Sequence, residues 1–135
     1  MMNINCDLGE GLNNEHLIMP LINSCNIACG GHAGDSQSMI ECVEISIKND
    51  VEIGAHPSYP DKESFGRKKI DISRSDLYYS LIDQIETLNS IAISILFDHV
   101  LGSTVIFFID TFFMVLVVAF FTIKFDPPSG ISLSV

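Results

Sequence analysis

At 135 residues the chain is long enough for one domain with its own apolar core. Its formal net charge of −10 argues against nucleic acid as a partner, because phosphate binding needs clustered Lys and Arg side chains. The composition changes sharply near residues 91–97: eight of the nine Phe follow Leu96, and few charged residues do. We therefore predict a polar region at residues 1–96 and an apolar tail at residues 97–135.

The cysteines indicate a reducing compartment. All four lie in the polar region, and the first residues have neither the basic start nor the apolar run of a signal peptide. We expect a cytoplasmic protein in which these cysteines are small buried thiols. Soft metal ligation by Cys25, Cys29 and His32 is the alternative, but their spacing lacks the second ligand pair of a zinc knuckle, so buried thiols are favoured.

Strands and helices are predicted to alternate along the polar region. A short helical segment interrupted by Pro20 is expected between the first two strands, at Glu15–Ile22. The strands end in turns rich in Gly or Pro, and are expected at Ile4–Leu8, Ser24–Cys29 and Val51–Ala55.

Two longer helices are predicted from apolar residues at helical spacing. Asp35 or Ser36 can begin the first, at Ser36–Lys48, and Asn49 can end it. The second helix begins after a segment that resembles a capping box, Ser73-Arg-Ser-Asp76. Its apolar face is predicted to carry Leu77, Leu81, Ile85 and Leu88.

This order of elements predicts an α/β fold with a parallel sheet. About three βαβ units are present, and three parallel strands cannot close a barrel. The outer edges of such a sheet would also lack partners. The polar region therefore has the pattern of one piece of a larger α/β fold.

The apolar tail leaves several interpretations open. Residues 105–123 are apolar apart from Asp110 and two Thr, and the run approaches the ~20 residues that cross a bilayer. Asp110 counts against a spanning helix, at about 2.5–3.5 kcal/mol near the helix centre. A membrane helix is favoured modestly. A buried pair of strands and an out-of-frame or unrelated tail are the competing interpretations.

Polar side chains follow each predicted strand. Asp7 and Glu10 stand at the carboxyl end of the first strand, His32 follows the second and His56 ends the third. Because parallel strands gather their carboxyl ends at one rim, these residues are expected to meet there. Asp and His together suit metal-assisted hydrolysis or carboxamide chemistry. The alternatives are a turn stabilised by the two carboxylates and histidines with structural roles.

Three further residues are candidates for binding a substrate. Asp35 stands in a Gly-rich segment before a helix, where helix capping is favoured over ligand binding. Asp61 follows the Pro-rich loop that comes after the third strand. Arg67 begins a short basic cluster, Arg67-Lys-Lys69, that could attract a carboxylate or phosphate; an exposed loop face is the equal alternative.

The ordered motifs resemble the LamB/YcsF family, which is associated with the A component of the ATP-dependent 5-oxoprolinase. The resemblance covers roughly residues 3–92, about the first third of a typical member. Its segments are Asn5-Cys-Asp-Leu-Gly-Glu-Gly11, Met19-Pro-Leu-Ile22, Asn26-Ile-Ala-Cys-Gly-Gly-His-Ala-Gly-Asp35, Ile53-Gly-Ala-His-Pro-Ser-Tyr-Pro-Asp61 and Phe65-Gly-Arg67.

The resemblance implies a (β/α) barrel of the glycoside hydrolase and deacetylase type. It implies ATP as cofactor and the opening of 5-oxoproline to L-glutamate, in partnership with subunits B and C. The candidate residues at the barrel mouth are then Asp7, Glu10, His32, His56 and Asp61. One hypothesis is that Asp7, His32 and His56 bind a divalent metal or polarise the lactam carbonyl, while Glu10 moves protons.

The sequence departs from the family after Ala92, where the expected Lys-Pro-His-Gly segment is absent. We therefore expect a truncated or frame-shifted member that is inactive alone. A fragment anchored to a membrane for interaction, and a metal-dependent carbohydrate deacetylase, are the alternatives. Residues 30–34 lack the Lys-Ser/Thr of a phosphate-binding loop, so the sequence shows no ATP site of that kind.

Overall fold

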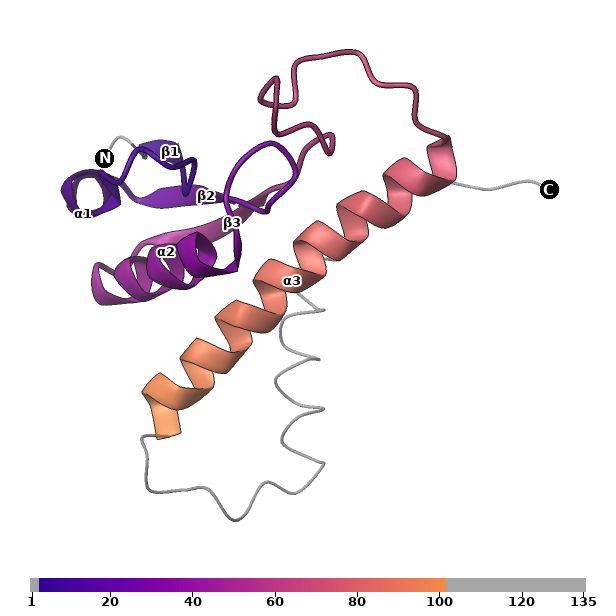
Figure 1. The fold of residues 1–135 in the computed structure, drawn as a ribbon. Coiled ribbons are helices and arrows are strands. Elements are labelled where there is room, and N and C mark those ends of the chain that lie inside the picture. The colour runs from indigo at the N-terminus through magenta and orange to yellow at the C-terminus, as the bar shows by residue number, and fades with distance from the viewer. Residues whose placement is uncertain (1–2, 102–135) are drawn as a thin grey trace. The chain divides into compact units, whose positions relative to one another are not determined.

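The computed structural model describes residues 3–101, and its elements follow the predicted alternation of strands and helices (Figure 1). Three parallel strands form one sheet in the order β1-β2-β3. The strands are β1 (Asn5–Leu8), β2 (Ser24–Ala28) and β3 (Glu52–His56). The helices are α1 (Glu15–Ile18), the 3-10 turn η1 (Met19–Leu21), α2 (Ser36–Lys48) and α3 (Arg74–Leu101). The α/β class and the small parallel sheet are confirmed.

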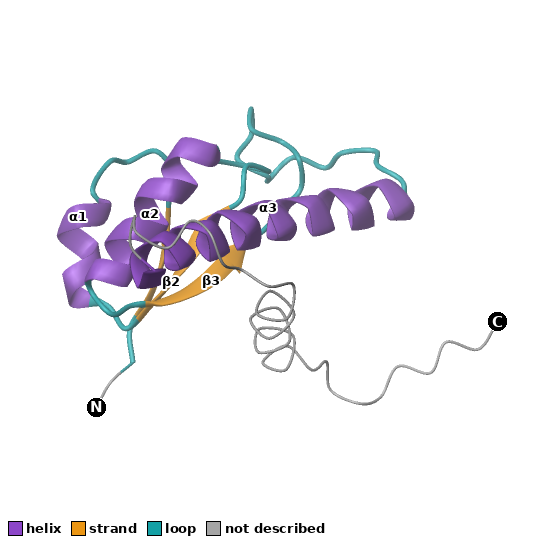
Figure 2. Ribbon diagram, turned by 90° about the horizontal axis from the view of Figure 1, so that it is seen from below, coloured by secondary structure: helices purple, strands orange, loops and turns teal. Residues whose placement is uncertain are grey.

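One face of the sheet is apolar and carries the core. This apolar face includes Leu8, Cys25, Ile27 and Ala55, which alternate along the strands with residues of the other face. Ile27 on the central strand is fully buried, as is Val43 of α2. The helices α2 and α3 lie against this sheet (Figure 2). Val43 of α2 and Leu88 and Ala92 of α3 belong to one buried apolar cluster with Leu8, Cys25 and Ile27 of the strands. Apolar burial on this face holds the sheet and helices together.

The opposite face of the sheet is polar. This polar face includes Asn5, Asp7, Ser24, Asn26, Gly54 and His56, which the parallel register brings side by side. The Asn26 side-chain amide donates to Asn5 Oδ1 at 2.9 Å and to Asp7 Oδ1 at 3.0 Å. Gly54 leaves room for Asn26, since a Cβ there would lie 2.6 Å from Asn26 Oδ1. This face is thus organised by hydrogen bonds between side chains.

The helix α2 has the bounds that the sequence predicts. Asp35 is its N-cap: its Oδ1 accepts from the Ser38 N–H at 2.9 Å, and the Ser38 hydroxyl oxygen accepts from the Asp35 N–H at 2.9 Å. Asn49 is the C-cap. The expected segment Glu15–Ile22 divides into α1 and η1, because Pro20 lies at the start of the 3-10 turn.

The helix α3 begins as predicted, but one residue of its predicted apolar face is exposed. The Ser73 hydroxyl oxygen accepts from the Asp76 N–H at 3.1 Å, which fixes the start of the helix. Leu88 is buried, but Ile85 is 40% exposed, so its predicted place on the buried face is wrong. Gln84 is buried in its place, 6% exposed, because its amide bonds the loop that follows β3.

The predicted membrane helix at 105–123 and most of the predicted tail lie outside the described residues. Among residues 3–101, none of the helices combines the length and the apolar character needed to cross a bilayer.

Candidate functional site

Two loops and one strand end, all at the carboxyl ends of the strands, bring the predicted polar side chains together. Gly9 turns the chain after β1 with a positive φ of 75°, which places Glu10 beyond the strand end. His32 lies in the Gly-rich loop after β2, and His56 is the last residue of β3. The prediction that these side chains meet at one rim of the sheet is confirmed by their distances.

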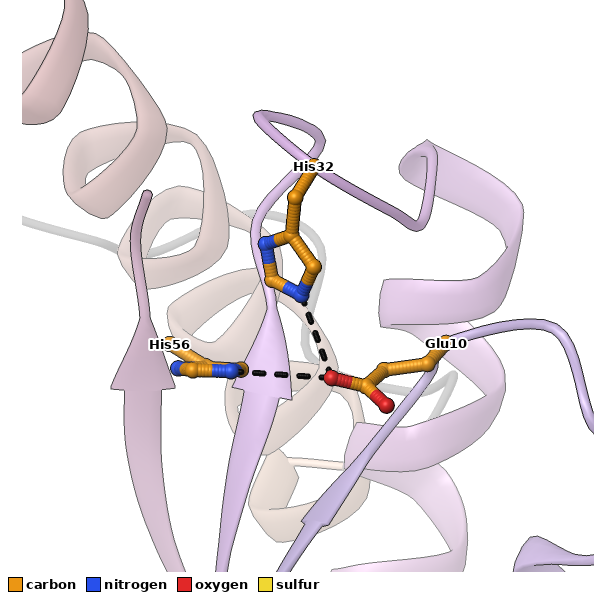
Figure 3. Close-up of side chains that lie close together, drawn as sticks. All are labelled: Glu10, His32 and His56. Carbon is orange, nitrogen blue, oxygen red and sulfur yellow. Dashed lines mark hydrogen bonds and ion pairs between the residues drawn. The ribbon is translucent and has the colours of Figure 1, made fainter. Parts of the chain in front are cut away.

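Glu10 is the centre of this group, which we call the rim cluster: Glu10, His32 and His56 (Figure 3). Its Oε1 lies 3.1 Å from His32 Nε2 and 3.5 Å from His56 Nε2. The two imidazole rings meet edge to face, with centroids 4.7 Å apart. Each residue offers a ligand atom, and these atoms lie within 4.8 Å of one another, so the cluster has the donor types that hold a divalent metal.

His32 is the most buried member of the rim cluster, at 4% exposure. Its Nδ1 lies 2.7 Å from Ser58 Oγ, and its ring makes a T-shaped contact with the Phe65 ring at a centroid distance of 4.8 Å. Gly66 also packs closely, since a Cβ there would lie 3.1 Å from the His32 Cβ. Both ring nitrogens therefore have polar partners, and the ring orientation is fixed by packing.

Gln84 of α3 holds the loop that carries Ser58. Its Oε1 accepts from the Ser58 N–H at 3.0 Å, and its Nε2–H donates to the Ser58 carbonyl oxygen at 2.9 Å. Gly31 lies against this pair, because a Cβ there would lie 2.5 Å from Gln84 Oε1 and 2.6 Å from Ser58 Oγ. The helix therefore supports His32 through Ser58.

Asp7 lies beside the rim cluster. One carboxylate oxygen, Oδ1, accepts from Asn26, and the other, Oδ2, lies 3.8 Å from His56 Nε2. The hypothesis drawn from the sequence placed Asp7 with His32 and His56 in a metal site. The structure instead brings Glu10 to the two histidines, and Asp7 is not one of the three residues whose ligand atoms group together.

A cleft of about 610 Å³ opens over the rim cluster. Arg67 lines it, with its guanidinium 5.4 Å from the centre of the Phe65 ring. The remaining wall includes Pro57, Tyr59, Leu77 and Leu81. The cleft thus combines an acidic and imidazole floor with one cation and several apolar side chains, as a site for a small polar molecule requires.

The two other predicted binding residues organise the backbone and are not among the residues that line the cleft. Asp35 caps α2, and the hydrogen bond from the Ser38 N–H holds the pKa of its carboxyl below the usual range. Asp61 accepts from the Ser64 N–H at 3.1 Å and the Lys68 N–H at 3.2 Å. For Asp35 the capping interpretation favoured by the sequence is the one that the structure bears out.

The cysteines are free thiols, as expected, and three of the four are buried. Burial raises the pKa of the Cys25 and Cys29 thiols, and raises the pKa of Cys42 to about 12. Their sulfurs occupy structural positions, with Cys25 Sγ 3.4 Å from Ser46 Oγ in the core. The alternative of soft metal ligation by Cys25 and Cys29 has no support in this geometry.

Sequence reasoning missed the residues that support the site. Ser58 and Gln84 act through His32, and Asn26 acts through Asp7. Asn26 could have been found, because it alternates with the apolar Cys25 and Ile27 on a central strand. Ser58 and Gln84 stand 26 residues apart, and nothing in their local pattern indicates that they pair.

Comparison with known proteins places this geometry in a family. The LamB/YcsF family model matches residues 2–99, which extends slightly past the segment in which the motifs were found. The crystal structure of a lactam utilization protein from Thermus thermophilus has a TM-score of 0.65 and 32% sequence identity. The match covers 69% of this chain and 40% of that protein. The rim cluster lies wholly within the matched residues, and the chain belongs to the LamB/YcsF family.

Proposed function

We propose that this chain carries the amino-terminal part of the active site of a 5-oxoprolinase A component. The reaction is the ATP-dependent opening of the lactam ring of 5-oxoproline to give L-glutamate, in partnership with subunits B and C. The observation that carries the proposal is the rim cluster, which lies in a cleft of a LamB/YcsF chain. The solved relative from Thermus thermophilus is itself described as a lactam utilization protein.

The chemistry of the cleft suits a small cyclic amide that carries a carboxylate. Arg67 at the wall supplies a cation for the carboxylate, as a guanidinium does in bidentate pairs. The rim cluster at the floor supplies imidazole and carboxylate groups that can polarise a carbonyl and exchange protons. Leu77 and Leu81 offer apolar contact for the ring methylenes. Amide cleavage also needs ATP, whose site we assign to no residue of this chain.

The test is a glutamate-release assay on a longer family member that carries the same residues at the positions of Glu10, His32 and His56, mixed with subunits B and C. Loss of one acid–base group typically lowers turnover about 10²–10⁴-fold. We expect that loss for alanine at the position of His56 or His32. Alanine at the position of His16, which is exposed on α1, should leave turnover within about twofold. Unchanged turnover in both site variants would overturn the proposal.

Two predictions from the sequence remain to be tested in the same way. Assaying the 135-residue chain without added subunits tests the prediction that it is inactive alone. Supplying an N-acetylated oligosaccharide and measuring acetate tests the alternative of a carbohydrate deacetylase. The lactam assignment is preferred because the solved relative is described by lactam utilization.

A further inference from the structure

We propose that Glu10, His32 and His56 form a three-ligand site for a divalent transition-metal ion, with zinc as the best fit. The proposal assigns Glu10, rather than Asp7, as the carboxylate ligand. It deepens the proposed function and rests on the same cleft, but metal binding is measured without substrate. Failure of the metal site and failure of lactam opening can therefore be told apart.

The hydrogen bonds around His32 leave one ring nitrogen facing a carboxylate. The Ser58 hydroxyl can donate to the Tyr59 carbonyl oxygen at 3.2 Å or to His32 Nδ1 at 2.7 Å, and metal binding would select the first arrangement, in which the His32 Nδ1–H donates to the Ser58 oxygen. In this tautomer His32 Nε2 carries a lone pair and faces the Glu10 carboxylate at 3.1 Å. Two acceptors then face each other in a largely buried place, and a cation between them removes the repulsion.

The second histidine is aimed at the same carboxylate oxygen. His56 Nε2 lies 3.5 Å from the Glu10 Oε1 that His32 approaches (Figure 3). Two ligand atoms bound about 2.1 Å from a tetrahedral zinc ion are about 3.4 Å apart. The separations of 3.1 and 3.5 Å from Glu10 Oε1 to the two imidazole nitrogens bracket that value. Two imidazoles and one carboxylate are also the ligand set of zinc sites that keep a fourth position open.

The proposed ligands are held by a second layer of contacts. Ser58 fixes the His32 ring through Nδ1, and Gln84 fixes Ser58 through both of its backbone groups. Such outer contacts orient the histidines of metal sites and set which nitrogen faces the ion. Asp7 Oδ2 lies 3.8 Å from His56 Nε2, the same nitrogen that would face the ion, so Asp7 borders the site, and its other carboxylate oxygen accepts from Asn26. A bound ion would supply Lewis acidity toward a carbonyl oxygen in the cleft.

The test uses the full chain, stripped with a chelator and titrated with Co²⁺, whose visible absorption reports coordination. We expect one cobalt ion per chain, displaced by Zn²⁺. Glu10→Gln and His56→Ala should each weaken binding at least tenfold. His56→Ala carries the test if the buried His32 cannot be replaced without unfolding, because the His56 side chain is 34% exposed.

Two controls separate the ligands from their neighbours. Asp7→Asn should weaken cobalt binding less than Glu10→Gln does, and a loss as large as that of Glu10→Gln would overturn the choice of ligand. His16→Ala, at an exposed position on α1, should leave the affinity within twofold. Absence of cobalt binding, or a thiolate-to-cobalt charge-transfer band indicating cysteine ligands, would overturn the metal site.

Discussion

The two faces of the three-stranded sheet have different roles: one forms the apolar core, and the other carries polar side chains toward the rim cluster. The apolar face buries Ile27 and Cys25 completely beneath the helices, and its contacts are those of a core. On the polar face, Asn26 donates hydrogen bonds to Asn5 and Asp7. Asp7 in turn lies beside His56 of the rim cluster. Alternating side chains of the same strands therefore supply stability to one side and chemistry to the other.

The largest effect should come from the apolar face. Ile27→Ala removes a fully buried side chain from the central strand and is expected to lower the free energy of unfolding by about 2–5 kcal/mol. Asn26→Ala, at the next position but on the polar face, should cost about 1 kcal/mol, because its bonds are exposed. Urea unfolding of both variants measures the difference, and equal losses would contradict the division between the faces.

A smaller loss in the free energy of unfolding is expected at the contact between Gly31 and Gln84, beside the rim cluster. In Gly31→Ala the new Cβ would lie 2.5 Å from Gln84 Oε1, and such overpacking costs about 1–3 kcal/mol. Removing the Gln84 side chain as well should relieve part of the cost, so the double variant should lose less than the sum of the two singles. Simple additivity in urea unfolding would show that Gly31 and Gln84 do not meet as described.

The N-cap of α2 predicts that the stability of the folded chain depends on pH. Hydrogen bonding lowers the pKa of Asp35 in the folded chain, below the value of about 3.9 that Asp has when unfolded. Its stabilising contribution is therefore complete above the unfolded pKa and is lost as the pH falls through the folded pKa. Asp35→Ala should lower the urea midpoint at pH 7, and the gap to the unmodified chain should narrow below about pH 4. A gap that widens in acid would contradict the cap.

The smallest expected effect is a difference in alkylation rate between Cys6 and the three buried cysteines. Burial raises the pKa of Cys25, Cys29 and Cys42, so these residues hold little thiolate near neutral pH. Cys6 is only partly buried, at the edge of the apolar face. Brief alkylation at pH 8 followed by mass spectrometry should label Cys6 first. Early labelling of Cys42 would mean that the core opens more readily than its packing implies.

The sequence could predict what depends on local pattern. The start of α2 follows from Asp35 and Ser38, which are three residues apart and form a capping box, and its end follows from Asn49. Convergence of Glu10, His32 and His56 follows from the general geometry of parallel strands.

The sequence could not predict what depends on distant contacts. Ile85 was expected on the buried face of α3, but Gln84 occupies it because it binds a loop 26 residues away. The position of Glu10 beside the two histidines depends on the turn at Gly9, whose positive φ redirects the chain after β1. The alternation of apolar and polar residues in the strand does not predict the direction that the chain takes after Gly9.

The most direct test of the division between the faces is thermal unfolding of the full chain and of His56→Ala, each with and without Zn²⁺. Ligand at about 100 times its Kd stabilises a folded chain by about 2.7 kcal/mol. We predict equal midpoints without zinc, because His56 is partly exposed, and a zinc-dependent rise in the unmodified chain only. If His56→Ala unfolds early without zinc and zinc shifts neither protein, then the polar rim is structural and the division of labour between the faces is wrong.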